Sequence, residues 1–260
     1  MALRASLHSI RRESDRASGW FASIVAERWT SSPAPRRSSR SPGSPRATHG
    51  PAGSLPQVIA VIDYRAGNAP SVGFALERLG LPHRLVTNAS ELADADRIIL
   101  PGVGAAQATM DSLGDSGLVE PLAERVQVDR LPFLGICIGL QVLLEHSEEG
   151  DVDTLGWVPG RVRRFPDSLR VPQIGWNAVR TMRPHPVTDG LGPDAYCYFV
   201  NSYFADPADP ADALGRTEYG AEFCSVLAHD NIVATQFHAE KSGAVGLALL
   251  DRFATWDGTC

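Results

Sequence analysis

Short apolar runs alternate with helical patterns in the middle of the chain. Such runs predict buried strands, and they fall at residues 57–63 (QVIAVID), 84–87 (RLVT), 97–100 (RIIL) and 132–136 (PFLGI). Helical patterns follow the first run as far as Leu79, occur twice between residues 105 and 128, and follow the last run from Cys137 to about His146. Strands that alternate with helices indicate a parallel sheet with helices on both faces.

The pattern changes beyond residue 150. Short β-like segments, separated by turns rich in Gly, Pro and Asp, follow at 161–165, 196–204, 223–227 and 232–236. A last helix is predicted from Gly243 to about Trp256. Its apolar residues fall on one side and are Val245, Leu249, Leu250, Phe253 and Ala254. The predicted fold class is α/β, with a largely parallel sheet and an antiparallel extension.

Composition narrows the classes of protein. Of 260 residues, 43% are hydrophobic and 21% are charged, which is enough to bury a sizeable core. The longest apolar stretch, 131–144, is interrupted by Pro, Gly and Gln, well short of the about 20 residues that a membrane span needs. The four cysteines are far apart and form no C-x-x-C pair, so neither a disulfide framework nor a metal site is predicted. We expect a cytoplasmic protein.

Residues 1–56 differ in composition from the rest. They carry nine arginines and three acidic residues, whereas residues 57–260 carry 15 basic and 27 acidic residues. The stretch is rich in Ser and Pro and has no hydrophobic periodicity, so we interpret it as a disordered leader before a single domain at 57–260. We favour a dispensable leader, or a true start near Leu55, over a transit peptide. A transit peptide is in turn favoured over a nucleic-acid-binding arm.

The sequence Gly135-Ile136-Cys137-Ile138-Gly139 joins a predicted strand directly to a predicted helix. This is the pattern of a nucleophile elbow, in which the flanking glycines leave room for a close approach of strand and helix. The helix N-terminus then lies against the thiol and favours the thiolate. A buried cysteine at a glycine-rich helix start is the structural alternative.

Two other segments favour the catalytic interpretation. His238 and Glu240 follow an apolar strand, and in an extended chain residues i and i+2 point the same way, so the carboxylate can orient the imidazole as a base for Cys137. Pro101-Gly102-Val103-Gly104 follows another apolar strand. Its backbone N–H groups, with that of Ile138, are candidate donors for an oxyanion hole; a plain glycine turn is the alternative.

Together these motifs give the chain a family resemblance. The elbow cysteine, PGVG and the C-terminal QFHAEKS resemble those of the class I (triad) glutamine amidotransferases, and within them those of the glutaminase subunits of imidazole glycerol phosphate synthase. The narrower resemblance rests on Asp63-Tyr64, Gly67-Asn68, Ser71-Val72, Gln173-Ile174-Gly175-Trp176-Asn177, Phe199-Val200 and Ser202-Tyr203. It extends from Gln57 to near the C-terminus.

The resemblance implies a Cys137, His238 and Glu240 triad that hydrolyses L-glutamine to glutamate and ammonia, without a metal or a cofactor. It also implies an oxyanion hole from Gly102, Val103 and Ile138. Bound glutamine is expected to contact Gln141 and Glu149. Gln141 lies four residues after Cys137 and therefore shares a helix face with it.

A partner is implied as well. In this family the ammonia passes to a (β/α)8-barrel cyclase subunit, where it is used to form imidazole glycerol phosphate and an aminoimidazole carboxamide ribonucleotide in histidine biosynthesis. A barrel needs about 250 residues, so we expect a separate polypeptide and a heterodimer. Asn68 and Lys241, the chain's only lysine, match positions on the docking face. A solvent-facing lysine without a function is the alternative.

The sequence departs from the family pattern at three positions. Ala239 replaces the usual proline between the triad His and Glu, Asn201 stands where histidine is common, and Pro70 replaces a longer side chain. Three other functions stay open: an amidotransferase subunit of another synthase, a cysteine hydrolase on the same fold, and a catalytically silent subunit that only binds a partner.

Overall fold

The computed structural model describes residues 57–65, 68–192 and 195–259, so the predicted leader at 1–56 lies outside the described residues. The strands are β1 (Ile59–Ile62), β2 (His83–Val86), β3 (Arg97–Gly102), β4 (Phe133–Cys137), β5 (His146–Ser147), β6 (Val152–Asp153), β7 (Gly160–Arg164), β8 (Gln173–Thr181), β9 (Ala195–Asn201), β10 (Tyr203–Pro207), β11 (Ala213–Glu218), β12 (Glu222–His229) and β13 (Ile232–Thr235). The α-helices are α2 (Ala69–Leu79), α3 (Ala106–Asp115), α4 (Val119–Ala123), α5 (Ile138–Gln141) and α6 (Gly243–Thr255). Short 3-10 turns are η1 (Ala89–Leu92), η3 (Pro210–Asp212) and η4 (Ala239–Lys241), and a π-helical turn, η2 (Glu124–Val128), follows α4.

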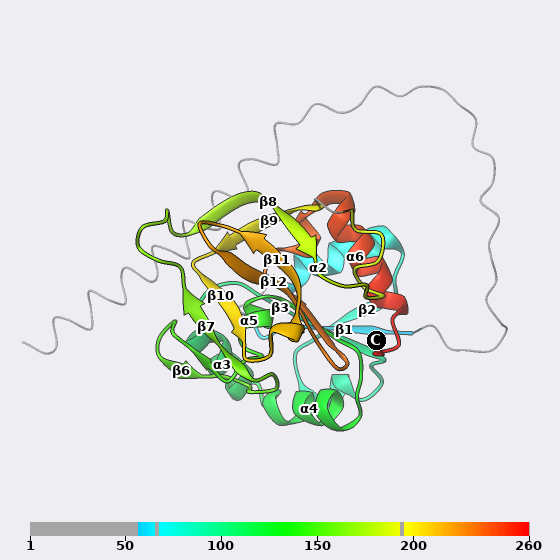
Figure 1. The fold of residues 1–260 in the computed structure, drawn as a ribbon. Helices are drawn as coiled ribbons and strands as arrows, with labels where there is room; N and C mark the ends of the chain where they lie inside the picture. The colour runs from blue at the N-terminus through cyan, green and yellow to red at the C-terminus, as the bar shows by residue number, and fades with distance from the viewer. Residues whose placement is uncertain (1–56, 66–67, 193–194, 260) are drawn as a thin grey trace, which may run out of the picture. The chain divides into compact units, whose positions relative to one another are not determined.

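The sheet has a parallel half and an antiparallel half (Figure 1). The parallel half has the order β2-β1-β3-β4-β13. Beyond β13 the strands β12, β10 and β7 pair antiparallel, and β11, β8 and β9 continue as an antiparallel branch from β12. The predicted sheet, parallel with an antiparallel extension, is confirmed.

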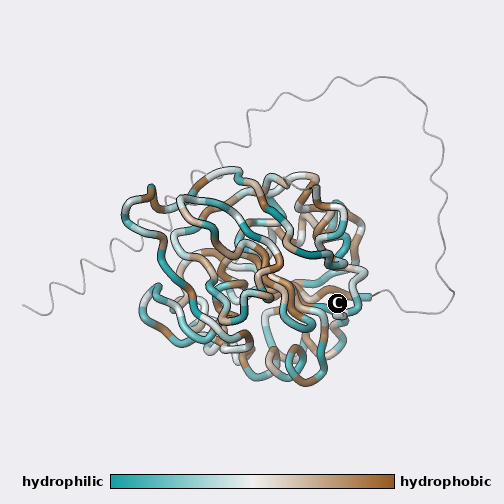
Figure 2. The backbone as a smooth tube through the Cα atoms, in the orientation of Figure 1, coloured by the Kyte–Doolittle hydropathy of each residue, from teal (hydrophilic) through white to brown (hydrophobic). Residues whose placement is uncertain are grey.

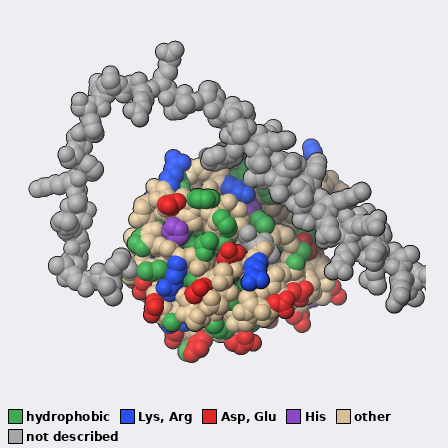
Figure 3. Space-filling model, turned by 180° about the vertical axis from the view of Figure 1, so that it is seen from behind, with side chains coloured by type: hydrophobic (Ala, Val, Ile, Leu, Met, Phe, Trp, Pro, Cys, Tyr) green, Lys and Arg blue, Asp and Glu red, His purple; other side chains and the backbone are tan. Residues whose placement is uncertain are grey.

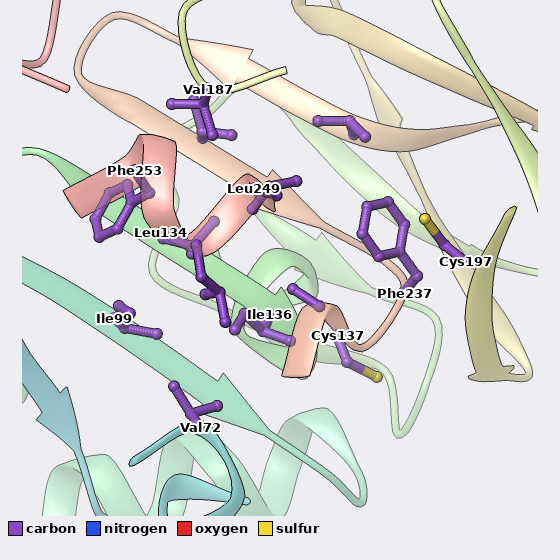
Figure 4. Close-up of a cluster of buried hydrophobic side chains, with 14 of the residues drawn as sticks. Val72, Ile99, Leu134, Ile136, Cys137, Val187, Cys197, Phe237, Leu249 and Phe253 are labelled. Carbon is purple, nitrogen blue, oxygen red and sulfur yellow. The ribbon is translucent and has the colours of Figure 1, made fainter. Parts of the chain in front are cut away.

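Helices cover both faces of the parallel half because its strands are apolar on both sides. Ile59 and Val61 of β1 face the side where α2 and α6 pack, whereas Ala60 and Ile62 face α3 and α4. This alternation follows from the two-residue period of a strand. Figure 2 shows the apolar strands at the centre of the fold. Figure 4 shows Leu134 and Ile136 of β4 in the first of these clusters, with the Cys137 sulfur at its edge.

Two sequence predictions need correction. The helix predicted from Cys137 to about His146 ends at Gln141, because the carbonyls of Val142, Leu143 and Leu144 accept hydrogen bonds from the loop at 155–158. These tertiary contacts replace the helical pattern. Strands β5, β6, β8 and β11 lie outside the segments predicted from the sequence. Strands β5 and β6 have only two residues each. Strands β8 and β11 each contain a glycine, and in β8 only Gln173 and Val179 are buried, so neither forms an apolar run.

The surface of the described residues is mixed, and acidic side chains are frequent on the lower part of the face in Figure 3. No helix among the described residues is long and apolar enough to cross a membrane. The same residues contain no group of three or more His, Cys, Asp or Glu side chains that could hold a metal ion.

Candidate active site

The elbow is present at the junction of β4 and α5. Cys137 has φ 57° and ψ −105°, a strained conformation for a residue with a side chain. The two glycines are required by close packing. A Cβ on Gly135 would lie 2.5 Å from the carbonyl oxygen of Gly139, and a Cβ on Gly139 would lie 1.9 Å from that of Leu100. The helix that follows is only one turn long, so the expected effect of its dipole on the thiol is small.

His238 and Glu240 form the second part of the site. The His238 Nδ1 lies 2.9 Å from Glu240 Oε1, and both side chains are buried. The contact was predicted from extended geometry, but β13 ends at Thr235 and Glu240 belongs to the 3-10 turn η4. A tight turn, rather than a strand, therefore brings the carboxylate to the imidazole.

Backbone contacts to β9 hold this turn in place. The His238 N–H donates to the carbonyl of Tyr198 at 3.0 Å, and the Tyr198 N–H donates to Ser242 Oγ at 3.0 Å. The Ser242 hydroxyl in turn donates to the carbonyl of His238 at 2.7 Å. Because Ser242 is 1% exposed, this ring of hydrogen bonds is shielded from water.

The electrostatics of the pair favour a protonated imidazole. Burial alone lowers the pKa of His238, but the charges of Glu240 and Cys137 outweigh burial and raise this pKa to about 10. An interaction of the ring with the Cys137 thiol also raises this pKa. Burial raises the pKa of Glu240, and His238 more than offsets this, so that the carboxyl pKa lies below its ordinary value. At neutral pH, His238 therefore carries a proton that it can transfer to a substrate.

The predicted oxyanion segment lies beside the elbow. Strand β3 runs parallel to β4, with Gly102 level with Cys137. A Cβ on Gly102 would lie 2.9 Å from Ile138 Cβ and 2.5 Å from the hydroxyl of Tyr64, so these residues are in close contact. Val103 follows at the end of the strand, and its side chain is 40% exposed. The structure thus places Gly102 against Ile138, with Val103 next in the chain, and their role as an oxyanion hole stays a prediction.

Gln141 and Glu149 lie on the β10 side of the elbow. Gln141 is buried and donates to the carbonyl of Tyr203 at 3.1 Å. Glu149 accepts a hydrogen bond from the Ala106 N–H, at the start of α3, at 3.0 Å. Burial raises the pKa of Glu149, and this hydrogen bond lowers it in part. Its charge in turn contributes, after burial, to the raised pKa of Tyr203.

Asn68 and Lys241 both act on the Glu240 carboxylate. Asn68 Nδ2 donates to Glu240 Oε1 at 2.6 Å, so this residue supports the His238–Glu240 pair directly. Lys241 is half-buried, and its charge contributes to lowering the pKa of Glu240. Both residues predicted for the partner interface therefore also touch or influence the triad.

Comparison with known proteins identifies the family. Residues 60–255 match the family model of the class-I glutamine amidotransferases. The chain belongs to this family. Among curated proteins it is similar to imidazole glycerol phosphate synthase subunit HisH of Herpetosiphon aurantiacus, with 48% identity over 74% of this chain and 91% of that protein. The protein of the same name from Dehalococcoides mccartyi strain 195 is 43% identical, over 75% of this chain and 96% of that protein.

Solved structures support the class-I glutamine amidotransferase fold. One glutamine amidotransferase crystal structure has a TM-score of 0.63 and 19% identity, and the match covers 77% of this chain and 99% of the other. The structure of PurLQS from Thermotoga maritima has a TM-score of 0.61 and 16% identity, over 77% of this chain and 99% of the other. At this identity the comparison concerns the fold alone.

Three buried polar residues of this amidotransferase site appear in the sequence motifs and departures, but the sequence alone gave them no role. Gln236 contacts the Cys137 sulfur, Asn201 shares the Tyr203 carbonyl with Gln141, and Tyr64 lies against Gly102. Gln236 belongs to the QFHAEKS motif, in which the chemistry of His238 is the more obvious signal. Its position directly after an apolar strand was the signal that could have found it.

Proposed function

We propose that this chain is the glutaminase subunit of an imidazole glycerol phosphate synthase and works in the cytoplasm. It releases ammonia from L-glutamine for a cyclase subunit in histidine biosynthesis. The observation that carries the proposal is the strained Cys137, whose charge helps to raise the pKa of a His238 that Glu240 holds by Nδ1. Its support is the 43% to 48% identity to the HisH subunits.

In the first half-reaction, the Cys137 sulfur attacks the side-chain carbonyl carbon of glutamine. A C–S bond forms, and negative charge moves to the carbonyl oxygen, where the N–H groups of Val103 and Ile138 beside Gly102 stabilise it. His238 gives its Nε2 proton to the departing nitrogen, the C–N bond breaks, and ammonia leaves a glutamyl thioester. The raised pKa of His238 keeps this proton available at neutral pH.

In the second half-reaction, water attacks the thioester. His238, now neutral, accepts a proton from the water, and Glu240 stabilises the imidazolium that forms. The C–S bond breaks, which releases glutamate and restores the thiolate. Gln141 and Glu149 hold the α-amino end of the substrate through their side-chain oxygens.

The proposed partner docks on an exposed apolar surface, which we call the β8–β9 face. Its residues, which share one side of the β8–β9 ladder, are Ile174, Trp176, Tyr196, Tyr198 and Val200. Ile174, Trp176 and Tyr196 are each more than half exposed, a large apolar area to leave in water. Tyr198 also binds the backbone of His238, so a partner on this face lies next to the site of ammonia release. A barrel that covers it would shield ammonia from solvent.

The test measures glutamate and ammonia release from glutamine by the purified chain, alone and with a separate cyclase subunit plus its nucleotide substrate. Release that requires both, and that is lost in Cys137→Ala, is the expected result. Cys224→Ala is the matched control, because Cys224 is a similarly buried cysteine whose thiol donates to the Val226 carbonyl of its own strand rather than to a triad residue.

Three outcomes would contradict the proposal. Release without any partner would indicate a free-standing hydrolase on this fold. Absence of release with the partner, combined with tight binding to it, would indicate a catalytically silent subunit. Ammonia release that is stimulated by the synthase subunit of another enzyme, and not by the cyclase, would assign the chain to another amidotransferase complex.

A further inference from the structure

A chain of two buried amides connects the Cys137 sulfur to the backbone of β10. Gln236 Nε2 lies 3.8 Å from Cys137 Sγ, and Gln236 Oε1 accepts from Gln141 Nε2 at 3.1 Å. Gln141 Nε2 also donates to the carbonyl of Tyr203 at 3.1 Å. Gln236 is fully buried and Gln141 is 2% exposed, so water does not compete for these contacts.

One carbonyl group, that of Tyr203, sets the direction of every hydrogen bond that these two amides make. The Tyr203 oxygen can only accept, so the Gln141 atom that contacts it is the NH2 group. The second hydrogen of this NH2 group points to Gln236, and therefore the Gln236 atom that it meets is the oxygen. The remaining group of Gln236, its NH2, then faces Cys137. Reversing either amide would place two donors or two acceptors against each other.

From this geometry we propose that Gln236 is a positioning residue for the nucleophile, whose amide donates to Cys137 Sγ and holds the sulfur as thiolate in line with His238. This inference rests on the proposed function, since it assumes that Cys137 is the reacting group. The Gln236 NH2 group is the hydrogen-bond partner of the sulfur, and the charge of Cys137 in turn raises the pKa of His238. An N–H donor stabilises a negative sulfur more than a neutral one.

The same contacts link the nucleophile to the substrate site. Both hydrogens of the Gln141 NH2 group are used, by Tyr203 and by Gln236, whereas Gln141 Oε1 is buried and has no partner among the described residues. A buried acceptor without a partner is costly, and an ammonium group of bound glutamine would satisfy it. Substrate that binds this oxygen polarises the Gln141 amide and strengthens its hydrogen bond to Gln236.

The test is the pH dependence of Cys137 alkylation by iodoacetamide in the full chain, followed by mass spectrometry of the peptide that contains Cys137. Gln236→Met keeps the length of the side chain and removes the donor. We expect the midpoint of its alkylation profile to rise by about one pH unit. Gln236→Glu keeps an acceptor for Gln141 but turns a carboxylate toward the sulfur, and its midpoint should rise further. With the cyclase present, kcat should fall about tenfold in Gln236→Met, with a smaller change in KM.

Thr235→Val is the matched control, because Thr235 is buried beside Gln236 and its hydroxyl donates to the Phe237 carbonyl rather than to sulfur. Its midpoint should equal that of the wild type. Wild-type midpoints in both Gln236 variants would overturn the inference. If Gln236→Met fails to fold, Gln236→Leu takes its place, since it also removes the donor without adding a charge beside the sulfur. Alkylation of Cys137 no faster than that of Cys197 at any pH would instead count against the proposed function.

Discussion

Gly139 lies directly against the carbonyl oxygen of Leu100, so that a Cβ atom on Gly139 would be 1.9 Å from that oxygen. This contact locks the one-turn helix α5 onto strand β3 and thereby fixes the elbow at Cys137 against the oxyanion segment. Neither partner can yield by a rotamer change, because both contacting groups are backbone. The catalytic geometry therefore depends on a residue that has no chemistry of its own.

The first prediction concerns this contact. Gly139→Ala forces β3 and α5 apart, and we expect a loss of about 2–3 kcal/mol in the free energy of unfolding, measured by urea denaturation, together with loss of glutaminase activity. Gly114→Ala is the control, because a Cβ at this exposed position of α3 meets nothing within 4 Å. It should be neutral or slightly stabilising. Equal stability of the two variants would contradict the prediction.

Ser242 is predicted to matter for both stability and catalysis. Ser242→Ala leaves the Tyr198 N–H and the His238 carbonyl without their partner, which costs about 1–3 kcal/mol in a buried site. Because these groups hold the turn at His238, kcat should fall as well. Ser90→Ala, at an exposed position, should change neither quantity. A Ser242 variant that is destabilised but has full kcat would show that the hydroxyl does not position His238.

Glu240→Gln separates charge from hydrogen bonding. Glutamine keeps an oxygen for His238 Nδ1 but removes the negative charge that raises the pKa of His238. We expect kcat to fall at least about a hundredfold. The protonated imidazole should also be lost at lower pH, so the basic limb of the kcat profile moves to lower pH. Glu222→Gln, which removes an exposed carboxylate, should keep the wild-type profile. An unchanged basic limb in Glu240→Gln would contradict the assignment of that limb to His238.

The central features of this fold were predictable because they follow from local patterns. Buried parallel strands such as β1 and β4 are apolar on both faces, so the sequence shows them as short runs, and the elbow glycines stand beside the nucleophile in the sequence. The contact between His238 and Glu240 was predicted too, although for a wrong reason, since a turn rather than a strand creates it.

Other features depend on contacts between distant segments, which no local pattern contains. Helix α5 ends early because the loop at 155–158 takes the carbonyls of the residues that follow it. Strand β8 exposes alternate apolar residues, including Trp176, and so has the polarity pattern of neither a buried strand nor a loop. Gln236 meets Cys137 across 99 residues of sequence, and only the pairing of β13 with β4 brings them together.

His185 is predicted to make stability depend on pH. This residue is 2% exposed, and burial, with a smaller contribution from Arg183, lowers its pKa from 6.5 to about 4. Between these pH values the unfolded chain binds a proton here and the folded chain does not. The free energy of unfolding therefore decreases as the pH falls through this range, by at most roughly 3 kcal/mol. Urea denaturation of wild type and His185→Leu from pH 7 to 4.5 checks this, and parallel curves would contradict it.

The β8–β9 face gives the last prediction, which rests on the proposed partner. Trp176 is 55% exposed, but its ring packs edge-on against Tyr198 and lies near Gly243 at the start of α6, so these contacts order it before a partner binds. An ordered aromatic side chain beside a functional site has the properties of a binding hot spot. Trp176→Ala should weaken binding to the cyclase about 30-fold, measured by titration calorimetry, and leave the melting temperature of the isolated chain nearly unchanged.

Val128→Ala, at an exposed apolar residue outside this face, is the control and should bind like the wild type. Equal loss of affinity in both variants, or in neither, would remove the β8–β9 face as the docking surface.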